Sequence, residues 1–146
     1  MQFLSVPGTL DSLGAIADFI KAAAAEAGLD KKATYQLRLA VDEIATNIIV
    51  HGYEEAGLEG TVYLTYNVDD KALTFTIEDT GAAYDPHQHL LPEEDALHQP
   101  LEQRQIGGLG IYLALKGVDK FIYEREGDRN RNTFVMNRPP STGVSI

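Results

Sequence analysis

Cysteine is absent from this 146-residue chain, which excludes a disulfide scaffold, a thiolate nucleophile and a cysteine-ligated zinc site. No apolar run reaches the ~18 residues that a membrane-spanning helix needs. Basic residues are few: 12 Lys and Arg stand against 22 Asp and Glu, for a net charge of −10. Nucleic-acid binding needs several basic residues on one face, and the sequence has no such cluster. We therefore expect neither a membrane protein nor a direct nucleic-acid binder.

The N-terminal residues 1–7 lack the basic region and the apolar stretch of a secretory signal peptide, so we expect a cytoplasmic protein. The length suits one domain, and 44% hydrophobic and 23% charged residues are ordinary values for a globular protein. There is no internal repeat and no linker. We therefore expect residues 1–138 to form one domain and residues 139–146 to form a frayed tail.

Hydrophobic periodicity separates helices, with a repeat of 3.6 residues, from strands, with a repeat of two. The expected elements are a strand at 3–6, helices at 10–27 and 31–51, strands at 62–67 and 73–77, a helix opening at 107, and strands at 118–124 and 133–137. This order predicts an α+β fold, a two-layer α/β sandwich with helices on one face of a mixed, mostly antiparallel sheet. Residues 80–106 show no periodicity, and so long a stretch is typical of a functional lid.

Residues at the expected helix ends support these boundaries. Thr9 or Asp11 is a plausible N-cap of the first helix, and Gly28 is a good C-terminal stop. Asp30 can cap the second helix, which Gly52 is expected to end.

The second helix carries polar residues that its apolar stripe does not need. Glu43, Asn47 and His51 lie at i, i+4 and i+8 and should form a polar stripe beside the apolar one. A carboxylate can act as a general base, and an amide oxygen beside it is a good ligand for magnesium. Taken alone, such a stripe is more often an ordinary solvated helix face.

Two glycine-containing motifs follow. Asp79 and Gly81 come directly after a strand, where an aspartate can accept hydrogen bonds from the amine of a ligand while the backbone turns tightly. Gly107–Gly110 (GGLG) stand at a helix start, where unhindered backbone N–H groups and the positive helix end suit phosphate. Alone, the first motif also fits an ordinary turn and the second a flexible hinge.

The order of the three motifs is more specific than any one of them. A helical Glu43-x-x-x-Asn47, a strand-end Asp79-x-Gly81, a long lid and a helix-opening glycine cluster resemble the motifs of the ATPase family shared by gyrase, the heat-shock chaperones, histidine kinases and MutL. The small size, the string AVDEIATN at 40–47 and the sequence His-Gly-Tyr at 51–53 resemble the anti-sigma-factor serine kinases of bacterial partner-switching systems. The resemblance covers roughly residues 1–138.

The resemblance implies an ATP site with Mg²⁺. Glu43 would be the catalytic base, and Asn47 would ligate the metal. His51 would lie near the phosphates. Asp79 would accept a hydrogen bond from the adenine amine, with Gly81 giving room beside it.

At the phosphate end, Gly107, Gly108, Leu109 and Gly110 would supply the binding loop, and residues 80–106 would form an ATP lid. The family often has an arginine just before these glycines, and here Arg104 is the nearest candidate, displaced by two residues. A Gly-Thr pair usually closes the adenine site. Here Asn132 precedes Thr133, and Thr133 would take part through a water.

The resemblance also implies partners. These are a small anti-sigma antagonist protein, which would be phosphorylated on Ser or Thr, and a sigma factor, with a possible homodimer formed through the first strand and helix. The alternative is a non-catalytic module in which bound ATP orders a surface that sequesters a partner.

Other site types have less support in the sequence. There is no Gly-Lys-Ser/Thr, which excludes a P-loop. His87, His89 and His98 are spaced loosely enough that a polar lid explains them better than a metal site.

Overall fold

The computed structural model describes residues 1–89 and 106–139, without the side chains of residues 89 and 106–109. Its strands are β1 (Gln2–Pro7), β2 (Thr61–Val68), β3 (Ala72–Asp79), β4 (Lys120–Glu126) and β5 (Arg129–Asn137). Its helices are α1 (Leu13–Ala27), α2 (Lys31–Asn47) and α4 (Ile106–Lys116), with short helical segments η1 (Leu10–Ser12), η2 (Ile48–Glu54) and η3 (Pro86–His89). In the described ranges the element order is the predicted one.

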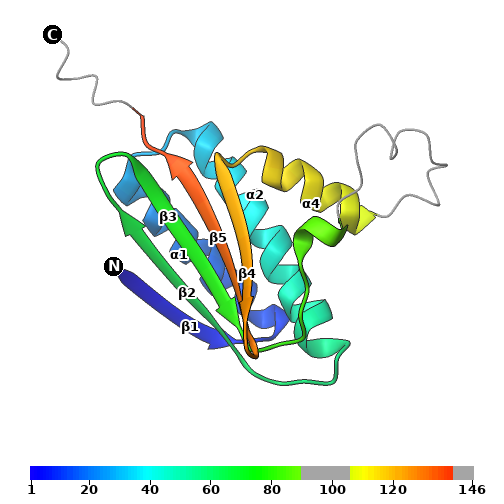
Figure 1. The fold of residues 1–146 in the computed structure, drawn as a ribbon. Helices are drawn as coiled ribbons and strands as arrows, with labels where there is room; N and C mark the ends of the chain where they lie inside the picture. The colour runs from blue at the N-terminus through cyan, green and yellow to red at the C-terminus, as the bar shows by residue number, and fades with distance from the viewer. Residues whose placement is uncertain (90–105, 140–146) are drawn as a thin grey trace, which may run out of the picture.

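The five strands form one sheet in the order β1-β2-β3-β5-β4, and α1, α2 and α4 cover one of its faces (Figure 1). This two-layer arrangement confirms the predicted fold class. Every pairing between these strands is antiparallel, so the parallel pairs that a mixed sheet would contain do not occur in the described part of the chain. The predicted hairpin joins β2 to β3, and the Asp69 carboxylate caps its turn by accepting from Lys71 N and Ala72 N.

Alternation along the strands decides which side chains meet the helices. On β3 and β5 the buried positions are every second residue. They fill the core with α1 and α2, with Leu73, Phe75, Ile77, Phe134 and Met136 on the sheet side. The same alternation turns the polar residues Asp79, Asn130 and Asn132 towards the helices at one end of the sheet, where all three are at most 3% exposed. Across residues 1–89 and 106–139, no helix has the length and hydrophobicity required to cross a membrane.

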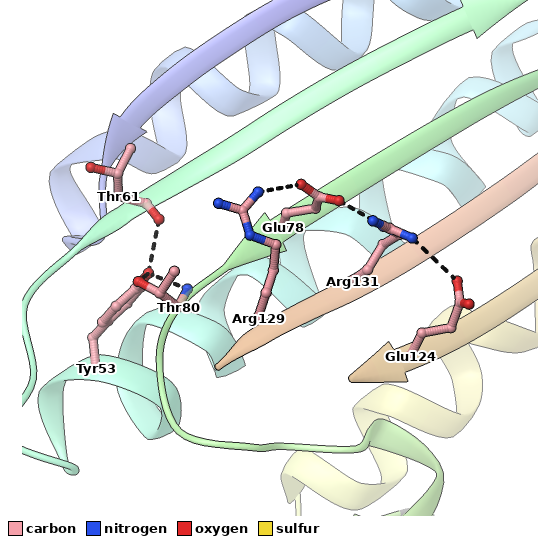
Figure 2. Close-up of polar contacts among 7 residues, drawn as sticks. All are labelled: Tyr53, Thr61, Glu78, Thr80, Glu124, Arg129 and Arg131. Carbon is pink, nitrogen blue, oxygen red and sulfur yellow. Dashed lines mark hydrogen bonds and ion pairs between the residues drawn. The ribbon is translucent and has the colours of Figure 1, made fainter. Parts of the chain in front are cut away.

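The opposite face of the sheet is not covered by helices (Figure 1). Next to Asp79, Glu78 points to this open face and accepts hydrogen bonds from Arg129 (2.9 Å) and Arg131 (2.6 Å) (Figure 2). Although partial burial acts in the other direction, these two arginines lower the pKa of Glu78. Neighbouring carboxylates at the end of β3 therefore have opposite environments, one paired on the surface and one buried against the helices.

The helix ends agree with two of the predicted caps and correct a third. Asp30 accepts a hydrogen bond from Ala33 N at 2.8 Å, and Gly28 has the positive φ of 71° that a C-terminal glycine permits. The prediction of Thr9 or Asp11 as the cap of α1 is wrong. A 3₁₀ turn, η1, precedes the helix, and Ser12 stands before its first residue with its hydroxyl donating to Pro7 O.

The prediction that Gly52 ends the second helix is also wrong. From Ile48 the chain continues as a π-helical segment through Glu54. Wide hydrogen bonds of the i→i+5 type follow, from Glu55 N to Val50 O (2.8 Å) and from Leu58 N to Tyr53 O (2.9 Å). The second helical run therefore extends past Gly52 in a wider turn.

Tyr53 ties the end of η2 to the sheet. Its ring is 1% exposed and lies where a side chain at Gly8 or Gly60 would collide with it. Its hydroxyl donates to Thr61 O at 2.8 Å and accepts from Thr80 N at 2.9 Å (Figure 2). Because Thr80 lies between Asp79 and Gly81, this tyrosine fixes the turn that carries the second motif.

Candidate functional site

The Asp79 carboxylate is buried, and only one of its two oxygens accepts hydrogen bonds. Oδ1 accepts from Gly81 N and from Asn130 Nδ2, both at 2.9 Å. Oδ2 is buried and has no hydrogen-bond partner. Burial raises the pKa of Asp79, and the donors from Asn130 and Gly81 and the charge of Arg125 offset only part of that rise. A buried acceptor without a donor is costly, and Asp79 Oδ2 is therefore suited to accept from an N–H or O–H group of a ligand.

Close backbone contact places the Asp79 turn against η2. Ala82 N donates to Gly52 O at 2.8 Å. A Cβ at Gly81 would lie 2.6 Å from Gly52 O and 3.1 Å from Asp79 Oδ1, which no side chain can tolerate without a backbone shift. The second motif therefore lies directly beside the extension of the helix that carries the first motif, and Gly81 leaves room there for the backbone of Gly52.

This contact gives a prediction with a matched control. We expect Gly81→Ala to displace the Asp79 turn and destabilise the protein by roughly 1–3 kcal/mol, the usual cost of overpacking. Gly52→Ala adds the same methyl group on the other side of the contact, but its Cβ would meet nothing closer than 3.8 Å. Thermal unfolding of both variants should show a much larger loss for Gly81→Ala. Equal losses would contradict this account of the glycine.

Glu43 and Asn47 lie on one face of α2, as predicted. A Cβ at Gly110 would lie 2.8 Å from Glu43 Oε1, so the carboxylate is packed against the first turns of α4. Burial raises the pKa of Glu43, and the polar side chain of Asn47 beside it offsets part of this rise. Asn47 is 7% exposed, and its Nδ2 makes no hydrogen bond. The alternative of an ordinary solvated helix face therefore does not hold for Asn47, which is buried.

His51 lies in the π-helical segment that continues α2. Its ring stacks on Tyr84, with centroids 4.9 Å apart and planes inclined by 7°. Its Nδ1 lies 2.5 Å from Glu55 Oε1. Tyr84 was not singled out from the sequence. The pKa of Tyr84 is raised by burial and then by the negative charges of Glu43 and Glu55.

The glycine cluster lies inside the first turns of α4 and not before the helix. In α-helical geometry the N–H of Gly110 points to the carbonyl of Ile106, whereas those of Gly107 and Gly108 have no partner within the helix. We therefore assign Gly110 a different role from a phosphate donor, which is to leave room for Glu43. Leu109 lies in the same turn, and Arg104 lies outside the described residues.

Thr133 is placed on the wrong face of the sheet for its predicted role. It pairs with Thr76 and Ile122, and alternation turns it to the open face, away from Asp79. The residue before it, Asn132, points to the helix side, is 1% exposed, and has a buried Oδ1 without a partner. The sequence held the signal: extending the alternation of β5 backwards from Phe134 puts residues 132 and 130 on the buried face.

Two other regions do not join this site. His87 Nδ1 pairs with Asp85 Oδ1 at 2.9 Å, and its ring packs on Phe121. The described residues contain no group of three possible metal ligands, while His98 lies outside them. A groove of about 1010 Å³ opens between the end of β1 and the loop from η2 to β2, lined by Tyr53, Leu10 and Leu58 among others. It contains neither Asp79 nor Glu43.

Comparison with known proteins agrees with this geometry. The family model of the histidine kinase-like ATPase domain matches residues 6–137. The serine/threonine-protein kinase BtrW of Bordetella bronchiseptica is 31% identical over 108 residues, covering 74% of this chain and 73% of that relative. The anti-sigma F factor of Bacillus licheniformis is 33% identical over 66 residues (45% and 40%), and the serine-protein kinase RsbW of Staphylococcus epidermidis is 28% identical over 94 residues (62% and 58%).

Among solved structures, the histidine kinase domain of the Erythrobacter litoralis EL346 blue-light activated histidine kinase superposes with a TM-score of 0.52 at 18% identity. It covers 85% of this chain and 60% of that one, and at this identity it speaks for the fold alone. These matches confirm the resemblance to anti-sigma-factor serine kinases that the motifs predicted. The chain belongs to the family of histidine kinase-like ATPase domains.

Proposed function

We propose that this protein is an ATP-dependent serine/threonine protein kinase that acts as an anti-sigma factor, phosphorylating a small antagonist protein. The names of the relatives support the kinase and anti-sigma activities. In the structure, the observation that carries the proposal is the buried Oδ2 of Asp79, an acceptor that lacks a donor next to a backbone turn without side-chain bulk. The exocyclic amine of adenine supplies the missing donor.

The other end of the site suits the triphosphate. Glu43 lies against the first turns of α4, where the free N–H groups of Gly107 and Gly108 and the positive helix end favour anionic oxygens. One continuous helical segment, α2 with η2, forms a rim that runs from the adenine end of the site to the phosphate end. This rim contacts the Asp79 turn through Gly52 and contacts α4 through Glu43.

A magnesium ion fits the residues on this rim. Carboxylate and amide oxygens are the hard ligands that Mg²⁺ takes in proteins, and the nearly buried Asn47 lies beside the Glu43 carboxylate. We propose that Asn47 ligates the ion through its Oδ1. When bound, Mg²⁺ neutralises the charge of the phosphate oxygens.

Glu43 then acts as the base in the transfer step. It accepts the proton of the serine or threonine hydroxyl of the partner as the hydroxyl oxygen bonds to the γ-phosphorus and the bond to the β-phosphate oxygen breaks, releasing ADP. Arg104 would neutralise the terminal phosphate, and His51 with Tyr84 would border the site near Glu43. Asn132, in place of Thr133, would face the adenine.

The partners follow from this proposal. They are the antagonist protein, which is the substrate, and a sigma factor, which is sequestered; we also keep the cytoplasm as the location, because ATP and sigma factors are both found there. A homodimer through the β1 edge is supported by the place of this strand at the end of the sheet and by the exposure of Phe3 (72%) and Leu10 (47%).

Replacing Asn47 tests the metal site and the ATP site together. In wild type, ATP with Mg²⁺ at about 100 times its dissociation constant should add roughly 2.7 kcal/mol of stability, a thermal shift of several degrees. We expect Asn47→Ala to fold normally, since alanine favours helix and the Nδ2 of Asn47 lacks a well-formed hydrogen bond, and to lose most of this shift. The measurement is thermal unfolding with ATP, with and without Mg²⁺.

The kinase itself is tested by incubating wild type with labelled ATP and candidate antagonist proteins. Phosphoryl transfer to a serine or threonine of one of them supports the proposal. Tight Mg²⁺-dependent ATP binding with no transfer to any candidate would favour the non-catalytic module. A full magnesium-dependent shift in Asn47→Ala would exclude the metal role of Asn47 while leaving the adenine site in place.

A further inference from the structure

We infer that Asn130 is the positioning residue that makes the nucleobase site selective for adenine, by holding Asp79 as an acceptor with one oxygen reserved for the ligand. This inference rests on the proposed ATP site and adds the device that sets its specificity. Neither Asn130 nor the two β4 residues that contact it, Tyr123 and Arg125, belongs to the motifs of the sequence.

The amide of Asn130 can take only one orientation. Its Oδ1 accepts from Arg125 Nη1 at 3.0 Å and from the hydroxyl of Tyr123. A guanidinium has donors only, so the atom facing Arg125 must be the oxygen. On the other side Nδ2 donates to Asp79 Oδ1 (2.9 Å) and to the carbonyls of Gly81 and Ala82 (3.2 Å each). A flipped amide would set its oxygen against three acceptors.

This fixed donor decides which oxygen of Asp79 remains for the ligand. Oδ1 receives two hydrogen bonds, from Asn130 and from Gly81 N, while Oδ2 receives none. If Asp79 took up a proton, the proton would therefore sit on Oδ2. Oδ2 would then be a donor towards the nucleobase, suited to the carbonyl oxygen of guanine and not to the amine of adenine. Asp79 therefore favours adenine while its carboxylate is ionised and loses this preference when it is protonated.

The groups around Asp79 account for which state is populated. The backbone of β3 and its turn contributes Gly81 N, β5 contributes Asn130, β4 contributes the charge of Arg125, and η2 contributes only the backbone of Gly52. Burial raises the pKa of Asp79, and the hydrogen bond from Asn130 is the strongest influence that lowers it again. Loss of Asn130 therefore moves the protonation of Asp79 towards neutral pH.

The test is the ratio of ATP to GTP affinity as a function of pH, measured by calorimetry with Mg²⁺ from about pH 5 to about pH 9. Both nucleotides carry the same triphosphate, so its titration and that of Glu43 cancel in the ratio. In wild type the ratio should favour ATP at neutral pH and fall as the pH falls. In Asn130→Ala we expect the ratio of ATP to GTP affinity to begin falling about one pH unit higher or more, because one hydrogen bond to a charged group is lost.

Three further variants keep the inference falsifiable. Asn130→Asp puts a second carboxylate beside Asp79 Oδ1 and should change the pH dependence of the ATP-to-GTP affinity ratio from that of wild type, because two adjacent carboxylates share one proton. Arg125→Met changes an exposed residue, so it tolerates substitution, and it should give a smaller shift in the same direction as Asn130→Ala. Asn137→Ala removes an exposed asparagine of the same strand whose side chain makes no hydrogen bond within the described residues, and it should match wild type.

The outcomes separate this inference from the proposed function. Failure of wild type to bind either nucleotide would sink the ATP site itself. ATP binding in wild type, with the same pH dependence of the ratio in Asn130→Ala, Asn130→Asp and Arg125→Met, would overturn the role of Asn130. A uniform loss of both affinities, with an unchanged ratio at every pH, would reduce Asn130 to a structural residue and would also overturn it.

Discussion

Replacement of Glu43 by alanine is expected to lower phosphoryl transfer by about 10²–10⁴-fold, the usual contribution of a general base, while ATP affinity stays near normal. The carboxylate lies against Gly110, where the triphosphate is proposed to bind, so its removal relieves repulsion with the phosphates and does not weaken the ground state. Helix α2 tolerates the change because alanine is the best helix former. ATP affinity by calorimetry and partner phosphorylation by mass spectrometry, on one preparation, give both quantities.

Two variants sharpen this experiment. Glu43→Gln keeps the volume packed against Gly110 but cannot accept the proton, so it should lose transfer like Glu43→Ala. Asp42→Ala removes a charge from the next position, where the carboxylate makes only a 3.6 Å ion pair with Arg38, and should keep normal transfer. Normal transfer in Glu43→Ala would rule out the base, whereas lost affinity with intact transfer per bound ATP would move Glu43 to the metal site.

The pH dependence of transfer supplies an independent check. A base works only when ionised, and burial raises the pKa of Glu43 above its ordinary value. At saturating ATP the rate should therefore rise with pH through that raised pKa, and this ascending limb should be missing from the residual activity of Glu43→Gln. An identical limb in the variant would assign it to another group.

Most of the fold could be predicted from the sequence, because the hydrophobic periodicity of its strands and helices extends over long, uninterrupted runs. Strands β2 and β3 alternate without interruption, and the apolar stripe of α2 runs from Leu37 to Ile44. The ends were harder, because they depend on local backbone choices. The π-helical segment after Asn47 has no composition of its own, and Gly52 fitted a helix stop as well as it fits close packing against the Asp79 turn.

The sequence predicted the site residues that belong to a motif. It did not predict the residues that only the tertiary structure brings to the site. Glu43 and Asn47 are neighbours on α2, and Asp79 and Gly81 form one turn that packs against η2. Asn130 and Asn132 were missed because the start of β5 was placed four residues too late, so the register that brings them beside Asp79 was not visible. Tyr84 was missed because it lies in the aperiodic stretch after β3, and its stacking on the ring of His51 is a tertiary contact that no spacing rule contains.

Replacement of Asp79 by asparagine is expected to lower ATP affinity by roughly ten-fold to more than a hundred-fold, since a hydrogen bond to a charged group contributes about 1.5–3 kcal/mol. Gly81 N and Asn130 Nδ2 both donate to the inner oxygen, so the new amide must keep its oxygen there and turn its Nδ2 towards the nucleobase. The variant should therefore prefer GTP to ATP, whereas wild type prefers ATP. Equal affinities of wild type for the two nucleotides would sink the assignment of Asp79.

The same variant should be the more stable protein when no nucleotide is present. Because burial raises the pKa of Asp79 above its unfolded value of 3.8, the native state binds this proton more tightly than the unfolded state. The contribution of Asp79 to stability is then full below the unfolded pKa and is lost as the pH rises through the folded one. At neutral pH the ionised carboxylate therefore costs stability, and Asp79→Asn removes that cost together with its pH dependence.

Thermal unfolding of the two proteins at several pH values, with and without ATP and Mg²⁺, compares the stability cost of the ionised Asp79 with the stability gained on ATP binding. Without nucleotide, Asp79→Asn should unfold at the higher temperature at neutral pH, and the difference should shrink as the pH falls towards the unfolded pKa. With ATP at about 100 times the wild-type dissociation constant, wild type gains roughly 2.7 kcal/mol and the order should reverse. If Asp79→Asn without nucleotide is less stable than wild type at neutral pH, the ionised Asp79 carboxylate stabilises the fold. Its Oδ2 would then not be an acceptor kept for a ligand at a cost in stability.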